Sequence, residues 1–162
     1  MRADAQRNLD RLLTVAGECF AERGLDVSVD EIARRAGVGH GTVFRRFATK
    51  DDLVAAVLRQ QLEELTETAV AAAADEDPWD GLERFVRTAA AGYAKNRALL
   101  DGIERCIRPT DKERLVAAVE EIVARAHRAG AIRPEVTLED VIALMPTAVR
   151  YPDVVLDGLR AR

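Results

Sequence analysis

The sequence predicts an all-α protein, and two observations support this fold class. Hydrophobic residues make up 48% of the chain and aromatic residues only 4%, with alanine and leucine prominent and alternating β-branched runs scarce. Apolar residues also recur at three- and four-residue spacing along most of the chain, as they do in amphipathic helices. We expect an N-terminal unit over residues 1–50, joined by a long helix to a helical bundle within residues 51–162.

The first predicted helix ends at Gly24 and carries an apolar stripe that covers the back of the N-terminal unit. The stripe contains Leu9, Leu12, Leu13, Ala16, Cys19 and Phe20. Ser28 and Glu31 form a capping box that opens a second helix, and Gly37 ends that helix after about two turns.

A tight turn at Val38 and Gly39 leads into a third short helix over residues 40–47. Two short helices joined by a glycine-containing turn follow the helix-turn-helix plan. The second of these helices carries hydroxyl and cationic side chains, the types that bind phosphates and base edges. They are Thr42, Arg45 and Arg46, with Lys50 just beyond the helix. The sequence therefore predicts a three-helix DNA-binding unit.

Residues 37–53, GVGHGTVFRRFATKDDL, resemble the recognition-helix signature of the tetracycline-repressor (TetR) family, G-V-S-x-G-T-L-Y-x-Y/H-F-x-S/N-K-E-x-L. The match begins near Leu9 and covers the first third of the chain. It implies a bacterial regulator that works as a homodimer on a palindromic double-stranded DNA operator, with repression relieved by a small-molecule effector. The implied DNA-binding residues are Ser28, His40, Gly41, Thr42, Phe44, Arg45, Arg46 and Lys50.

Within this set, the resemblance places Thr42 and Lys50 at phosphate contacts. Adjacent helical residues point ~100° apart, so at most one of Arg45 and Arg46 is expected to read a base. Phe44 departs from the family pattern, because the usual tyrosine offers a hydroxyl to a phosphate and phenylalanine does not. Phe44 either faces the DNA or points into the core of the unit.

Thr49 and Asp52 form a second capping box, which opens a helix of around 25 residues. Its apolar stripe holds Leu53, Val54, Val57, Leu58, Leu62 and Leu65, and residues 75–78 break it. Further apolar spacing predicts helices over 82–93, 99–107, 110–129, 137–145 and 152–159. Thr110 with Glu113 and Thr137 with Asp140 are expected to cap two of them, and Pro146 to follow the second.

The segment AGAIRPEVTLEDV and the ending DVVLDGLRAR resemble one actinobacterial branch of the family. Only the residues from Leu144 to Tyr151 stand between them, where that branch usually has a longer helix and loop. Either the last hairpin is shortened or residues are missing at this point, and we favour the second reading.

In the C-terminal half, the resemblance implies an effector pocket and a four-helix dimer interface made by the last two helices of each subunit. The pocket candidates are Trp79, Phe85, Tyr93, Cys106, His127 and Met145. Each of them could equally be a core residue, because an aromatic stripe at helical spacing is more often packing than a binding site. The interface candidates are Val141, Ile142, Met145, Val155 and Leu159.

Other functional classes have little support in the composition. Two cysteines and two histidines are too few for a disulfide framework, a metal cluster or a catalytic triad, so we expect no metal, no cofactor and no enzymatic activity. No apolar run is long enough to span a membrane, and no signal peptide is visible, which favours a cytoplasmic protein.

The charge is unevenly distributed, with a net value of −4 for the chain, +2 for residues 1–50 and −6 for the remainder. The alternative to a regulator is a helical small-molecule-binding protein or enzyme with a vestigial DNA reader. The missing hydroxyl at Phe44 and the negative net charge are its only support.

Overall fold

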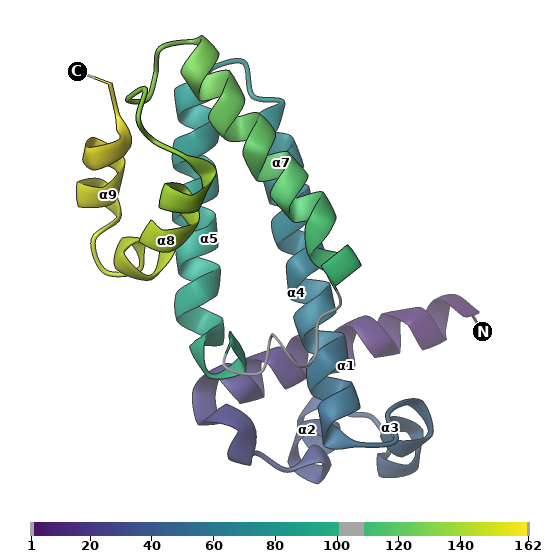
Figure 1. Ribbon diagram of the computed structural model, residues 1–162. Helices are drawn as coiled ribbons and strands as arrows, with labels where there is room; N and C mark the ends of the chain where they lie inside the picture. The colour runs from purple at the N-terminus through teal and green to yellow at the C-terminus, as the bar shows by residue number, and fades with distance from the viewer. Residues whose placement is uncertain (1, 101–108, 162) are drawn as a thin grey trace. The chain divides into compact units, whose positions relative to one another are not determined.

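The computed structural model describes residues 2–100 and 109–161, and every regular element within these ranges is a helix (Figure 1). The predicted all-α fold is therefore confirmed. The described residues divide into two compact units. The first holds residues 2–61 and 96–100, and the second holds Leu62–Lys95 and 109–161, so that two long helices contribute to both. Cys106 and most of the helix expected over 99–107 lie outside the described residues.

Four helices and a short 3-10 turn form the first unit. They are α1 (Arg2–Arg23), η1 (Gly24–Asp26), α2 (Val29–Ala36), α3 (His40–Arg46) and the beginning of α4 (Lys50–Ala73). Gly24 ends α1 in the left-handed region, at φ 66°, where glycine has no steric cost. Thr49 and Asp52 exchange both bonds of the predicted capping box at the start of α4, with distances of 3.0 and 3.1 Å.

The start of α2 departs partly from the prediction. The Ser28 hydroxyl accepts a hydrogen bond from the Glu31 amide at 3.2 Å, as expected of an N-cap. The Glu31 carboxylate forms an ion pair with Arg23 of α1, where the capping box would have returned it to Ser28. At the other end, Gly37 at φ 65° closes α2, and the Val38 amide donates to the Ala33 carbonyl. Both ends of α2 are therefore fixed.

The core of the first unit consists of buried apolar side chains from all four helices. They include Leu12, Ala16, Phe20, Ile32, Ala33, Val43, Phe47, Leu53 and Val57. A Cβ on Gly17 would lie 3.1 Å from Gln61 Nε2 and 3.5 Å from Val57 Cγ1, so α1 and α4 approach closely there.

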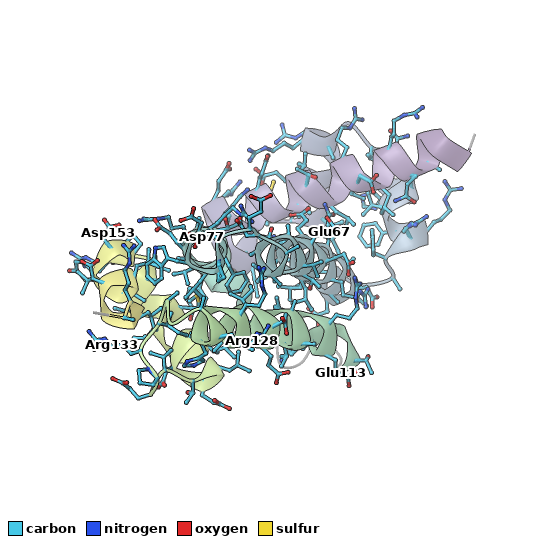
Figure 2. All side chains as sticks on the ribbon, turned by 90° about the horizontal axis from the view of Figure 1, so that it is seen from above. Glu67, Asp77, Glu113, Arg128, Arg133 and Asp153 are labelled. Carbon is cyan, nitrogen blue, oxygen red and sulfur yellow. The ribbon has the colours of Figure 1, made fainter. Side chains whose placement is uncertain are left out.

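The second unit contains three long helices and a short pair. These are the remainder of α4, α5 (Pro78–Leu100), α7 (Pro109–Arg128), α8 (Leu138–Ala148) and α9 (Pro152–Leu159). The short helices α8 and α9 lie against each other (Figure 1). Buried residues from all five form one apolar cluster, with Leu82, Ile122 and Leu159 among the most buried. Charged side chains such as Glu67, Glu113 and Arg128 lie on the outside of this unit (Figure 2).

The C-terminal end of α4 has a donor for each of its last four carbonyls, the groups that a helix leaves unpaired. The Ala71 carbonyl accepts from Arg84 of α5 at 3.3 Å, and the Ala73 carbonyl accepts from Arg125 of α7. The Val70 and Ala72 carbonyls accept from the amides of Ala74 and Asp75, both at 3.2 Å. Arginines from two neighbouring helices thus hold this end of α4.

The helices of the C-terminal half differ from the prediction in three respects. α5 extends beyond both ends of the helix expected over 82–93, and it continues to Leu100 without a break before the helix expected over 99–107. α7 begins at Pro109, so Thr110 is a helical residue and does not cap that helix. Pro146 lies inside α8 and does not follow it. Because Pro146 stands two residues before the last helical residue, it removes one backbone bond and the helix still closes its last turn. The capping box of Thr137 and Asp140 is confirmed in both directions.

Three contacts fasten α9 to the rest of the second unit. Arg87 of α5 donates to the Asp153 carboxylate at 2.7 Å. At the end of α9, the Arg133 amide donates to the Leu159 carbonyl and the Ala161 amide to the Ala131 carbonyl, both at 3.0 Å. These two bonds form an isolated antiparallel bridge that closes the end of the helix. In the described part of the chain, no helix combines the length and the apolar character needed to cross a membrane.

Candidate nucleic-acid interface and C-terminal pocket

The helix α3 has one buried side and one open side. Val43 is fully buried and Phe47, just past its end, is 9% exposed, so these two residues anchor α3 on the first unit. Every other residue of α3 is exposed, and the predicted DNA-binding residues His40, Gly41, Thr42, Phe44, Arg45 and Arg46 are all in that group. The structure therefore brings six of the eight predicted residues together on one short helix.

Cationic side chains of the first unit differ in their partners. Arg35 donates to both oxygens of Glu22 at 2.6 and 2.9 Å, and this guanidinium lowers the pKa of the Glu22 carboxyl. Arg23 is similarly paired with Glu31. Among the ion pairs of the described residues, none involves Arg45 or Arg46. Within the described residues, the positive charges of Arg45 and Arg46 thus have no ion-pair partner.

Two of the predicted DNA-binding residues have structural partners of their own. The Ser28 hydroxyl caps α2, and the Lys50 ammonium donates to the Leu25 carbonyl. An ammonium group has three donors, so this contact holds Lys50 at the start of α4 and leaves donors for another acceptor. Thr42 accepts a long hydrogen bond of 3.4 Å from Arg45, which links the hydroxyl and the guanidinium on the same helical face.

Phe44 is on the open side of α3, with 41% of its surface exposed. Its ring lies 4.5 Å from the His40 ring between centroids, with the planes inclined by 34°. His40 Nδ1 in turn meets the Asp30 carboxylate of α2. Asp30 could not be found from the sequence, because it is ten residues from His40 and only the packing of α2 on α3 brings the two together.

The predicted effector residues do not meet in one described cavity. Phe85 is part of the apolar core, Met145 packs against that core, and Tyr93 is half-buried. His127 Nε2 is hydrogen-bonded to the Val136 carbonyl at 2.8 Å, so it fixes the loop before α8. Trp79 lines a pocket of about 290 Å³.

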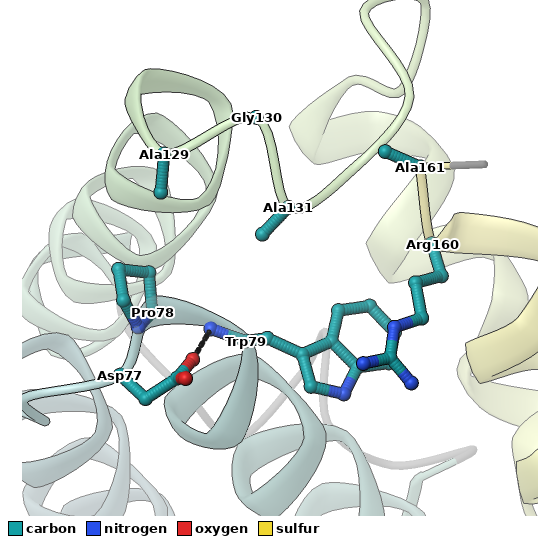
Figure 3. A pocket seen from close by; sticks show the side chains of 8 residues that line it. All are labelled: Asp77, Pro78, Trp79, Ala129, Gly130, Ala131, Arg160 and Ala161. Carbon is teal, nitrogen blue, oxygen red and sulfur yellow. Dashed lines mark hydrogen bonds between the residues drawn. The ribbon is translucent and has the colours of Figure 1, made fainter.

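This pocket lies between the start of α5, the end of α7 and the residues after α9 (Figure 3). The Arg160 guanidinium covers the Trp79 ring at 4.7 Å, and Trp79 Nε1 donates to Glu83 at 3.2 Å. The Asp77 carboxylate accepts from the Trp79 amide at 2.7 Å and caps α5 (Figure 3). The polar groups of the pocket wall are therefore largely engaged with one another. No group of three His, Cys, Asp or Glu side chains within the described ranges could hold a metal ion.

The predicted interface residues divide by burial. Val141, Val155 and Leu159 are at most 4% exposed within the chain, so their side chains already pack in the core of the second unit. Helical spacing showed that these three residues lie on apolar helix faces, but it did not show that the chain itself covers those faces. Ile142 is 52% exposed, and three further apolar residues near it in sequence are open as well. They are Val149, Tyr151 and Val154.

Comparisons with known proteins agree with this architecture. Residues 12–57 match the family model of bacterial regulatory proteins of the tetR family, and residues 77–161 match the SbtR-like transcriptional regulator C-terminal domain. A TetR transcription regulatory protein from Mycobacterium vanbaalenii shares 38% identity, with a TM-score of 0.82 and 99% of each chain covered. A TetR regulator from Streptomyces coelicolor shares 27% identity, with a TM-score of 0.75 and coverage of 94% of this chain and 98% of that one.

An HTH-type transcriptional repressor of Mycobacterium tuberculosis is 44% identical over 92 residues, which are 56% of this chain and 46% of that protein. The chain thus matches about half the length of its curated relatives. The two family models together extend from α1 to the residues after α9. The chain therefore belongs to the TetR family of bacterial regulatory proteins, with an SbtR-like C-terminal domain.

Proposed function

We propose that this chain is a transcriptional repressor that binds a DNA operator through α3. The observation that carries the proposal is the division of α3 into an anchored side, Val43 and Phe47, and an open side with uncompensated positive charge. Cationic and hydroxyl groups on a short exposed helix are the groups that bind phosphates and base edges in the major groove. Binding to chromosomal DNA would place this activity in the bacterial cytoplasm.

Individual roles follow from the contacts on this surface. Lys50, held by the Leu25 carbonyl at the start of α4, would direct its remaining donors to a phosphate. Arg45, next to Thr42, would reach a base edge, and a guanidinium that bonds guanine in two places discriminates by ~1–3 kcal/mol.

The experiment compares Lys50→Ala and Arg45→Ala on DNA from upstream of the protein's own gene and on randomised duplexes, over a series of salt concentrations. Lys50→Ala should weaken binding to all sequences alike and reduce the salt slope by about one. Arg45→Ala should relax the preference at one operator position. Identical behaviour of both variants across the library would contradict this division of roles. If the unaltered protein binds no duplex at low salt, the alternative of a small-molecule-binding protein or enzyme with a vestigial reader is favoured.

We further propose a homodimer formed through α8 and α9. Ile142 is 52% exposed and Val154 67% exposed, and Val149 and Tyr151 lie between them in the sequence. Large apolar side chains this open to water are typical of an interface. The same patch on two copies would make an isologous contact, and its two-fold symmetry would match a palindromic operator.

The second unit would bind a small-molecule effector that releases the operator. Such an effector must bind the conformation with the wrong spacing of the two α3 helices more tightly than the DNA-bound one. A coupling of ~1–3 kcal/mol would loosen the operator by about 5- to 150-fold. Trp79, with the pocket that it lines, remains a candidate contact, whereas Phe85 and His127 are better explained by their structural contacts.

A further inference from the structure

His40 is held from two sides at the beginning of α3. Its Nδ1 atom meets the carboxylate of Asp30, which stands in the first turn of α2. Its ring also lies on Phe44, one helical turn further along α3, with 4.5 Å between centroids. All three side chains are exposed, so this assembly faces solvent on the open side of α3. An imidazole with two such neighbours has far fewer orientations than one on a free helix.

The contact with Asp30 determines where the imidazole carries its hydrogen. An ionised carboxylate only accepts hydrogen bonds, so Nδ1 must be the donor. Without a partner, the neutral ring could carry the hydrogen on either nitrogen. With Asp30 in place, Nε2, on the other side of the ring, is the atom available to a binding partner.

Folding stability alone is a weak explanation for this pair. The side chains of His40 and Asp30 are 61% and 71% exposed, and ion pairs so open to water contribute little to stability. Asp30 also suits the positive end of α2, but any acidic residue in that turn would do so. On a surface that approaches DNA phosphates, a carboxylate weakens binding by charge repulsion. The presence of Asp30 there therefore calls for a further role.

We propose that Asp30 is a positioning residue for sequence readout: it fixes the hydrogen of His40 on Nδ1 and directs Nε2 to the edge of one operator base pair. The Phe44 ring, which is in contact with the imidazole of His40, supports the same orientation of the imidazole. This inference rests on the proposed DNA-binding function and assigns a specificity role to a residue of α2 that does not itself touch a base.

The test uses the full chain and selection from a randomised double-stranded DNA library, at one stated pH and salt concentration. The unaltered protein and four variants are compared: His40→Ala, Asp30→Ala, Asp30→Asn and the double alanine variant. We expect His40→Ala to remove a preference of roughly three- to tenfold at one position, the range that one hydrogen bond supplies. Asp30→Ala should flatten the same position. Asp30→Asn should keep most of the preference, because the amide oxygen still accepts from Nδ1.

The double variant separates positioning from simple electrostatics. If Asp30 acts through His40, Asp30→Ala has no further effect on base preference once His40 is alanine. Asp26→Ala is the matched control, since Asp26 is an exposed acid of the same unit and its loss should change affinity equally on all sequences.

A uniform affinity gain from Asp30→Ala, with the base preference intact, would overturn the inference. So would a flattened preference that Asp30→Asn fails to retain while the melting temperature falls, because Asp30 would then be structural. If the unaltered protein selects no sequence at all, the proposed DNA-binding function has failed instead, which is a distinct result.

Discussion

Phe44 lies on the open side of α3, where the hydroxyl of a tyrosine would be close to whatever α3 binds. Its ring is 41% exposed and in contact with His40, so it is not part of the core of the first unit. Of the two orientations left open by the sequence, the structure has the outward one. A hydroxyl at the far end of this ring would extend into solvent and would not be buried.

The substitution Phe44→Tyr is therefore expected to strengthen DNA binding. A hydrogen bond to a charged phosphate is worth ~1.5–3 kcal/mol, which corresponds to roughly tenfold or more in affinity. The gain should be equal on specific and non-specific duplexes, because phosphates carry no sequence information. Affinity titrations together with thermal melting provide the measurement, and the melting temperature should stay unchanged. A lower melting temperature without a gain in affinity would show that the ring packs inward in solution.

Single residues also show the limit of prediction from sequence. Val43 and Phe47 lie four residues apart, so helical spacing alone is enough to place them on one side of a helix. The role of Asp30 cannot be found in this way, because it depends on a contact between two helices. Phe85 and His127 could be recognised as apolar or polar, but whether each faces a cavity or the core depends on neighbours distant in the sequence.

At the scale of elements, α8 is defined by its first turn. Thr137 and Asp140 cap it reciprocally, and hydrogen bonds from the Thr137 amide and hydroxyl lower the pKa of the Asp140 carboxyl. A carboxyl with a lowered pKa in the folded state contributes stability above its unfolded pKa, near 3.8, and loses it as the pH falls through the folded value.

Thr137→Ala should consequently lower the melting temperature by about 3 °C at neutral pH. The difference in melting temperature from the unaltered protein should shrink in acid. Protonation of Asp140 then removes the stabilisation by its carboxylate from the unaltered protein and from the variant alike. Thr147→Ala is the control, because Thr147 is an exposed threonine of the same helix. Melting curves from pH 7 down to pH 3 give the comparison. A difference that stays constant over this range would mean that the Asp140 carboxylate plays no part.

The contact between α4 and α5 depends on the absence of a side chain at Gly81. A Cβ there would lie 2.4 Å from the Ala72 carbonyl oxygen and 3.1 Å from Asp75 Cβ. Gly81→Ala should therefore force the helices apart and destabilise the fold by ~1–3 kcal/mol, despite the higher helix propensity of alanine.

Gly158→Ala tests the same substitution where there is open space, since nothing lies within 4 Å of a Cβ at that position of α9. It should be neutral or slightly stabilising. Urea unfolding of both variants is the measurement. Equal effects at the two glycines would show that α5 does not approach α4 this closely.

Elements were the most predictable level of this protein, because their signals are local. The capping boxes at Thr49 and Thr137 and the glycine stop at Gly37 each depend on residues within four positions. The prediction for Pro146 was wrong for the same reason. Proline usually ends a helix, and the local sequence does not show that the last turn of α8 can still close after it.

For the whole molecule, assembly depends on apolar side chains that the folded chain leaves open. Sequence spacing could not separate Val141 and Leu159, which are covered by the chain itself, from Ile142, which is not. Both kinds belong to amphipathic helices, and only the packing of α8 against α9 and α7 decides which of them reaches the surface.

Ile142→Asp should consequently convert the proposed dimer to a monomer. Light scattering at micromolar concentration should give a mass near twice 17.8 kDa for the unaltered protein and near 17.8 kDa for the variant. Val70→Asp is the matched control, because Val70 is 53% exposed on α4, away from α8 and α9 in the sequence. A dimer that persists in Ile142→Asp, or dissociates equally in Val70→Asp, would contradict an interface on α8 and α9.

The arginine-held end of α4 has a mechanical consequence. Helix ends usually fray, because their last carbonyls have no partners within the helix. In α4 two of the last four carbonyls are bound by Arg84 of α5 and Arg125 of α7, so the end that would normally be loosest is tied to two other helices. A displacement of α5 or α7 would therefore move the last turn of α4 with it, so that this turn should open together with its neighbours and not by itself.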